Sequence, residues 1–307
     1  LVDQSGSMGC PFDSPEPCES PPTGLEPSDP STRWSQLRTA LLAETGPIFQ
    51  LQAEVNFGLQ LYGDDGPQAE VCPQMTPAVV NIAKNNYLGI KTTYLSATTK
   101  AGTPTPQGLQ RAVEALQGPG RDPLNPKYVV LATDGNPGSC DCTELIQSDC
   151  NDDVQWRTAT ETIAGEGFAG GVKTFVIGVG KGQVDQGHLQ RLALKGQGLP
   201  ETTTEQKFYE VGNATELIAA FNSIIFDGVR SCVIDLDATV APADAPKGKV
   251  TLGGQPVTYG DANGWKLLPS NDQIEFVGAA CTKVKDAATK IDVSFQCGSN
   301  VVPKPPR

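Results

Sequence analysis

The chain begins with Leu1-Val2-Asp3-Gln4-Ser5-Gly6-Ser7-Met8, in which an apolar pair runs directly into alternating Asp and Ser residues. This order predicts the end of a buried strand followed by a polar loop. Alternate side chains of an extended segment point the same way, so Asp3, Ser5 and Ser7 can direct their oxygens at one point. Three hard oxygen donors suit a small hard cation such as Mg²⁺. Taken alone, the pattern is equally typical of a serine-rich turn or helix cap.

Two later segments favour the metal hypothesis. Residues 127–134, KYVVLATD, form a second apolar run that ends in Asp134, and residues 101–105, AGTPT, form a glycine-led turn that presents Thr103 before a helix. Ligands of open parallel sheets bind beyond the carboxyl ends of the strands, where the strand order reverses. Loops ending in Asp3, Ser5, Ser7, Thr103 and Asp134 at that edge would supply five oxygens and leave one coordination position free.

Hydrophobic patterning predicts an α/β fold with a doubly wound, mostly parallel sheet. Strands are expected at residues 55–61, 128–132, 172–179 and 208–211. Helices are expected from Ser31, which would be the cap, to residue 45, from Pro77 through residue 83, after Thr103, over 186–195, and after a capping box at 213–216. The only histidine, His188, is interpreted as a surface residue.

The three oxygen-bearing segments resemble the metal-ion-dependent adhesion site (MIDAS) of von Willebrand factor A (VWA) domains, and the resemblance covers residues 1–227. It implies a Rossmann-like VWA fold with Ser5, Ser7 and Thr103 as direct ligands, and with Asp3 and Asp134 binding directly or through water. The expected cofactor is a divalent cation, Mg²⁺ first, with Ca²⁺ or Mn²⁺ as alternatives. In such domains a Glu or Asp of a partner protein completes the sixth position.

Composition restricts the partners and the compartment. The formal charge of −12 and the pI of about 4.6 argue against nucleic acid and anionic membranes as partners. No apolar run approaches the roughly 18 residues that a spanning helix needs. Because the numbering starts inside a predicted strand, we expect that the true N-terminus, with any targeting signal or lipid anchor, precedes the sequence.

Nine cysteines indicate disulfides and an oxidising compartment, either extracellular or at the cell surface or periplasm. The Cys140-Asp141-Cys142 spacing lacks the C-x2-C pairs of structural zinc sites. An odd count leaves one thiol free, bonded to another chain or paired beyond the sequence. The disulfide candidates are Cys10, Cys18, Cys140, Cys142, Cys150, Cys232, Cys281 and Cys297.

Two insertions are expected at the rim of the predicted metal site. One is the Pro- and Cys-rich segment 9–31, which a Cys10–Cys18 bridge would close, and the other is the Cys-rich loop 136–153. Each leaves directly from a predicted metal-binding loop, which favours a role in specificity over that of a tolerated surface loop.

After residue 227 the pattern changes to short alternating segments, which predict a small all-β sandwich over 228–302 and a Pro-rich tail over 303–307. Together with the cysteine cluster after Asp134, this arrangement resembles secreted or surface VWA proteins of myxobacteria and relatives.

These observations favour an extracellular adhesion module that binds an acidic side chain of a protein partner through a metal. The alternative is a structural subunit of a surface appendage or envelope assembly, in which the metal only stabilises loops. An enzyme is disfavoured, because the chain has one histidine, no recognisable catalytic triad and no phosphate-binding loop of the G-x4-G-K-[ST] type.

Overall fold

In the described residues, six strands form the sheet of the N-terminal unit in the order β3-β2-β1-β4-β5-β6. They are β1 Val2–Asp3, β2 Phe57–Tyr62, β3 Val79–Ala83, β4 Lys127–Thr133, β5 Val172–Val179 and β6 Tyr209–Val211. All neighbours pair in parallel except β2 and β3. The chain leaves β1 towards β2 on one side and later occupies β4 on the other, so the strand order reverses at β1 and β4.

The computed structural model describes residues 1–14, 18, 21–63, 79–100, 102–121, 125–138, 153–180, 185–229, 232–284, 290–295 and 301–303. It contains two compact units, Leu1–Ile224 and Ile225–Arg307. The predicted boundary at residue 227 falls inside helix α7, Ala214–Val229. Within the described ranges, no helix is both long and apolar enough to cross a membrane.

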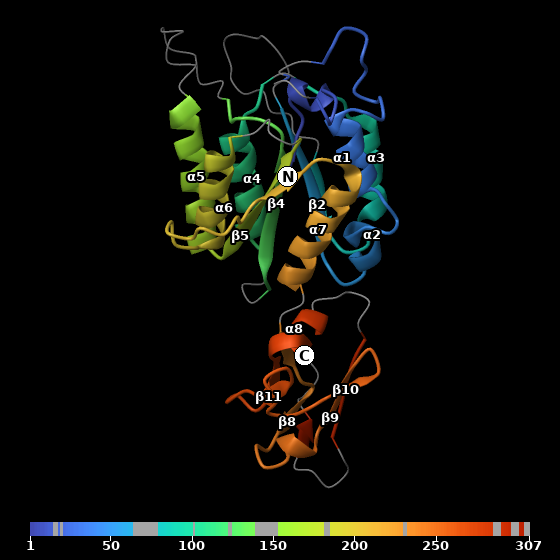
Figure 1. Ribbon diagram of the computed structural model, residues 1–307, viewed down its shortest axis with the longest axis vertical. Coiled ribbons are helices and arrows are strands. Elements are labelled where there is room, and N and C mark those ends of the chain that lie inside the picture. Colours follow the sequence, from blue (N-terminus) through green and yellow to red (C-terminus); the bar gives the residue numbers. More distant parts are fainter. Residues whose placement is uncertain are drawn as a thin grey trace. The chain divides into compact units, whose positions relative to one another are not determined.

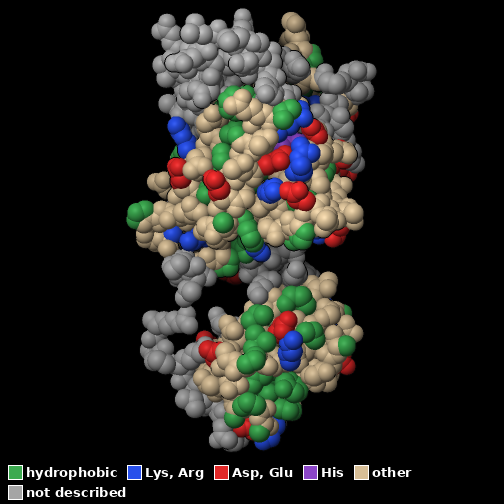
Figure 2. All heavy atoms as spheres, turned by 90° about the vertical axis from the view of Figure 1, so that its left-hand side faces the viewer, with side chains coloured by type: hydrophobic (Ala, Val, Ile, Leu, Met, Phe, Trp, Pro, Cys, Tyr) green, Lys and Arg blue, Asp and Glu red, His purple; other side chains and the backbone are tan. Residues whose placement is uncertain are grey.

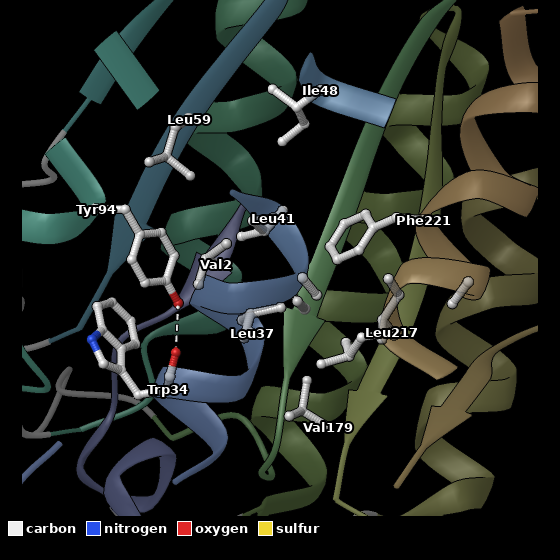
Figure 3. Close-up of a cluster of buried hydrophobic side chains, with 14 of the residues drawn as sticks. Val2, Trp34, Leu37, Leu41, Ile48, Leu59, Tyr94, Val179, Leu217 and Phe221 are labelled. Atoms are coloured by element: carbon white, nitrogen blue, oxygen red, sulfur yellow. Dashed lines mark hydrogen bonds between the residues drawn. The ribbon is translucent and has the colours of Figure 1, made fainter. Parts of the chain in front are cut away.

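Helices cover both faces of the sheet, as the doubly wound prediction requires (Figure 1). One face packs against α1 Arg33–Leu41, α2 Pro47–Leu51, α3 Tyr87–Ser96 and α7. The other packs against α4 Thr105–Gln117, α5 Asp153–Ala169 and α6 Gln186–Gln197. On the first face Trp34 stacks on Tyr94 with ring centroids 4.4 Å apart, and the Tyr94 hydroxyl donates to the Trp34 carbonyl (Figure 3).

Two predictions about the helices and strands of the N-terminal unit are wrong, and one helix was missed. Residues 79–83 form the edge strand β3 rather than a helix, because Val79, Val80 and Ile82 are β-branched and pair with β2. Helix α3, which follows it, was not predicted. Thr32, not Ser31, caps α1, since its hydroxyl accepts a hydrogen bond from the Ser35 amide.

His188 is buried rather than on the surface, with 2% of its area exposed. Its Nδ1 lies 2.8 Å from Glu161 Oε1, which also accepts from Arg191, and Asp185 caps α6 through the His188 amide. Figure 2 shows acidic and basic side chains gathered around this histidine on the face of the first unit. The sequence does not reveal this burial, because the partner Glu161 lies 27 positions away in α5.

The C-terminal unit contains three small antiparallel sheets around its own core. Its strands are β7 Val233–Asp235, β8 Ala238–Val240, β9 Lys249–Leu252, β10 Gln255–Val257, β11 Trp265–Leu267, β12 Gln273–Phe276, β13 Ile291–Ser294 and β14 Val301–Pro303. Short 3-10 turns occupy Gly6–Gly9 in the first unit and Ala245–Lys247 here.

The small antiparallel sheets agree with the predicted β unit, and two details add to it. Helix α8, Gly278–Val284, packs on the core together with the strands. Pro303 ends β14, which pairs with β8, and therefore belongs to the unit rather than to a tail.

Among the described residues there are two disulfides, Cys10–Cys18 in the 9–31 insertion and Cys232–Cys281 between the start of β7 and α8. Cys140, Cys142, Cys150 and Cys297 lie outside the described residues, as do most of the 136–153 loop and the tail beyond Pro303.

Candidate metal site

The candidate site lies beyond the carboxyl ends of β1 and β4, where the strand order reverses. Asp3 is the last residue of β1, and Asp134 follows Thr133, the last residue of β4. Because these two strands are parallel neighbours, their ends meet at one edge of the sheet, and ligands of such folds bind at this point.

Four of the five predicted ligands form one hydrogen-bonded group. The Ser5 and Ser7 Oγ atoms lie 3.0 Å apart, and Ser7 Oγ donates to Asp134 Oδ1 at 2.8 Å. The Ser5 amide donates to Asp3 Oδ1 at 2.8 Å. The sequence pattern thus brings side chains 127 positions apart into contact.

Thr103 lies next to this group without joining it. Its carbonyl accepts from the Gly138 amide at 2.8 Å, which ties the turn before α4 to the loop after Asp134. Within the described residues, the structure shows no hydrogen bond from the Thr103 hydroxyl to the side chains of Asp3, Ser5, Ser7 or Asp134. Ser7 and Thr103 are half-buried, whereas Ser5 and the two Asp residues are buried, so within the group Ser7 is the residue nearest to solvent.

The spacing of the oxygens suits a small divalent cation. Oxygens at 2.0–2.1 Å from an octahedral cation lie about 2.9 Å from their neighbours. The distances from Ser5 Oγ to Ser7 Oγ and from Ser7 Oγ to Asp134 Oδ1, 3.0 and 2.8 Å, agree with that separation. Hydroxyl and carboxylate oxygens are also the kind of ligand that Mg²⁺ and Mn²⁺ prefer. Ser5, Ser7 and Asp134 could therefore hold the cation.

Burial governs the electrostatics of the two carboxylates. Desolvation and the nearby charge of Asp134 raise the pKa of Asp3 to about 7, against hydrogen bonds from Thr133 and Ser5 that lower it. Desolvation also raises the pKa of Asp134, and the Arg33 guanidinium opposes that rise. Two buried carboxylates this close favour a cation between them.

Two residues of the site were missed by sequence reasoning. Thr133 donates its hydroxyl to Asp3 Oδ2 at 2.6 Å and fixes that carboxylate. Arg33 Nη1 donates to Asp134 Oδ2 at 2.7 Å, in an ion pair whose side chains are 1% and 0% exposed. The sequence signals only the burial of Arg33, because it lies four residues before Leu37 and so on the apolar face of its helix; it does not reveal the partner Asp134.

The loop between Asp3 and Ser5 is fixed by the backbone of Gln4. Its amide donates to the Tyr62 carbonyl of β2, and its carbonyl accepts from the Lys100 amide, whereas its side chain donates to the Thr98 carbonyl. These contacts leave Ser5 and Ser7 free to face Asp134.

Comparison with known proteins identifies the fold. The sequence model of the von Willebrand factor type A domain matches residues 50–223, which is more than half of the chain. The chain belongs to the von Willebrand factor type A domain family. The match begins after Asp3, Ser5 and Ser7, although β1 lies in the centre of the VWA sheet.

Several solved structures are similar to this chain at low sequence identity. The pilus adhesin SpaC from Lactobacillus rhamnosus GG is similar with a TM-score of 0.51 and 16% identity over 98% of this chain and 42% of the adhesin. The PilB minor pilin from Streptococcus sanguinis gives a TM-score of 0.49 and 19% identity over 73% of this chain and 58% of the pilin. The manganese-loaded Plasmodium vivax TRAP protein gives 0.45 and 15% over 71% of this chain and 68% of that chain.

At 16% identity the similarity to the adhesin bears on the fold alone. The chain spans less than half the length of the adhesin. Among curated proteins, none shows significant sequence similarity to this chain.

Proposed function

We propose that this VWA domain is an extracellular, metal-dependent protein-binding module rather than an enzyme. The observation that carries the proposal is the group of Ser5, Ser7 and Asp134 oxygens at octahedral spacing, next to the buried Asp3. Family membership adds support, because the group lies at the end of the sheet where open α/β folds bind ligands.

The proposed ligand is a carboxylate on a partner protein. When bound, the cation would offer a coordination position to an external acidic group. The chain would hold that cation with neutral hydroxyls and two carboxylates, Asp3 and Asp134. Because Asp134 also faces the Arg33 guanidinium, the positive charge of the site would be incompletely neutralised. An acidic chain of net charge −12 could in this way bind an acidic partner.

Isothermal titration calorimetry with MgCl2, MnCl2 and CaCl2 tests the cation site. In chelator-stripped protein we expect saturable binding at one site, which Ser7→Ala should weaken at least about tenfold and Asp134→Asn should abolish. Ser96→Ala is the matched control, because the Ser96 hydroxyl bonds only the Thr93 carbonyl on the surface of α3. Absence of binding in the unmodified protein, or unchanged binding in both site variants, would overturn the proposal.

One observation favours the alternative of a structural subunit in a surface assembly. The hydroxyl and carboxylate groups are already linked to one another and to Arg33, so the three loops are held together without a partner. The two functions differ under chelation. Self-association or partner binding that is unchanged by EDTA would support the structural role, whereas loss of partner binding with EDTA and its return with Mg²⁺ would support adhesion.

A further inference from the structure

Arg33 places a second positive charge beside the candidate cation site. Its side chain is 1% exposed, and Nη1 lies 2.7 Å from Asp134 Oδ2 and 3.4 Å from the Ser7 carbonyl. Asp134 presents its other oxygen, Oδ1, to Ser7. Asp134 thus faces the Arg33 guanidinium with Oδ2 and the Ser7 hydroxyl with Oδ1.

The guanidinium has little else to neutralise it. Nε and Nη2 are buried and have no hydrogen-bond acceptor in the part of the chain that the structure describes. Gly180, at the end of β5, leaves the space that the group occupies, because a Cβ there would lie 3.0 Å from Nε. A buried charge with unpaired donors is costly. The main electrostatic partner of the guanidinium is the Asp134 carboxylate, with which Nη1 forms an ion pair.

We propose that Arg33 is the built-in counter-charge of the site, which replaces the cation when the site is metal-free and limits cation affinity when metal is bound. The inference rests on the proposed function and deepens it. Two ionised carboxylates balance a divalent cation, so Arg33 leaves a net charge of plus one. One carboxylate from a partner neutralises that charge. The open position should therefore bind an acidic side chain in preference to a neutral or basic one.

A built-in counter-charge at Arg33 should have opposite effects on the metal-free and the metal-bound protein. In Arg33→Gln the metal-free protein has two buried carboxylates without a counter-charge, so its melting temperature should fall. The cation no longer meets a like charge, so its dissociation constant should fall at least about tenfold. Saturating Mg²⁺ should therefore raise the melting temperature more in Arg33→Gln than in the unmodified protein.

The experiment combines MgCl2 titration with thermal melting of the full chain in EDTA and in Mg²⁺. Arg33→Lys keeps the charge and should retain an affinity within about threefold of the original. Arg38→Gln is the matched control, since Arg38 lies half-buried on the same helix, bonds Ser35 and should change neither quantity.

The outcomes separate this inference from the proposed function. If the unmodified protein binds Mg²⁺ and Arg33→Gln has the same or weaker affinity, or if the Gln and Lys variants shift affinity equally, the role of Arg33 is overturned while the cation site stands. If Arg33→Gln folds in Mg²⁺ but not in EDTA, the role of Arg33 is supported. If Arg33→Gln folds in neither condition, the test is the Mg²⁺ affinity of Arg33→Lys, and a loss of that affinity would overturn the role. Failure of the unmodified protein to bind any of the cations would overturn both.

Discussion

At the scale of single residues, the charge of Asp3 should make the metal-free protein sensitive to pH. Burial and the proximity of Asp134 raise the pKa of Asp3 to about 7, from an ordinary value of 3.8 in the unfolded chain. Between these values the folded state binds more protons, so the free energy of unfolding falls as the pH rises. We expect the melting temperature in EDTA to fall by several degrees between pH 5 and pH 7.5, at about 2–4 °C per kcal/mol.

Two variants check the origin of this pH effect. Asp3→Asn removes the charge, and its melting temperature should vary little over the same range. Asp292→Asn is the control, because Asp292 is half exposed and pairs with Lys290 on the surface, so its pH dependence should match that of the original. A melting temperature that rises with pH in the unmodified, metal-free protein would contradict the assignment.

The signals that the sequence carries at this scale are local ones. Asp3, Ser5 and Ser7 alternate within one loop, and Asp134 ends an apolar run, so their approach follows from parallel strand geometry. Arg33 could not be identified as part of the site, because its partner Asp134 is 101 positions away and comes from another loop. Thr133 was assigned only to a strand, and its bond to Asp3 depends on the register of β1 and β4.

At the scale of elements, α6 approaches β5 closely at a glycine. A Cβ at Gly196 would lie 2.7 Å from Thr174 Cβ and 2.8 Å from its carbonyl oxygen, which belong to the strand itself. Gly196→Ala should therefore move the helix away from the sheet and lower the free energy of unfolding by about 1–3 kcal/mol. Chemical denaturation of the full chain measures the change.

Gly165 provides the matched control on the neighbouring helix. A Cβ at Gly165 in α5 would meet its nearest neighbour, Lys195 Cβ, at 3.9 Å, which is ordinary contact. Gly165→Ala should stabilise the protein by up to about 1 kcal/mol through helix propensity alone. Equal effects of the two substitutions would show that the contact at Gly196 does not limit the packing of α6.

Elements with a continuous pattern were predicted well, and those decided by tertiary pairing were not. Strand β5 matches its predicted bounds because residues 172–179 form an apolar run typical of a strand covered on both faces. In β3 the apolar residues 79, 80, 82 and 83 suit either a helix or a strand, and the antiparallel pairing with β2 decides for the strand. Helix α8 was not predicted, because its seven residues are too few to show a clear helical period.

At the scale of the whole molecule, each unit has its own hydrophobic core. The core of the C-terminal unit is built only from residues of that unit, among them Trp265, Ile274 and Phe276. The candidate metal site belongs wholly to the N-terminal unit, and the Cys232–Cys281 disulfide to the C-terminal one. The division between the units follows Ile224, close to residue 227, where alternation with period two replaces alternating helices and strands in the sequence.

Separate cores predict two separate unfolding transitions in differential scanning calorimetry. MgCl2 should raise only the transition of the N-terminal unit, because a ligand stabilises the body that binds it. Replacement of both Cys232 and Cys281 by Ala should lower only the other transition. A disulfide across a sequence separation of 49 contributes about 2–4 kcal/mol, which is about 10 °C or more for a domain below 100 residues.

The disulfide of the insertion supplies the control for that experiment. Cys10→Ala with Cys18→Ala opens a loop with a separation of eight in the N-terminal unit and should leave the transition of the C-terminal unit unchanged. If a single transition responds to Mg²⁺ and to both disulfide variants, the two units unfold as one cooperative body. The cation and the Cys232–Cys281 bridge would then stabilise the same structure, and the division into independent units would be wrong.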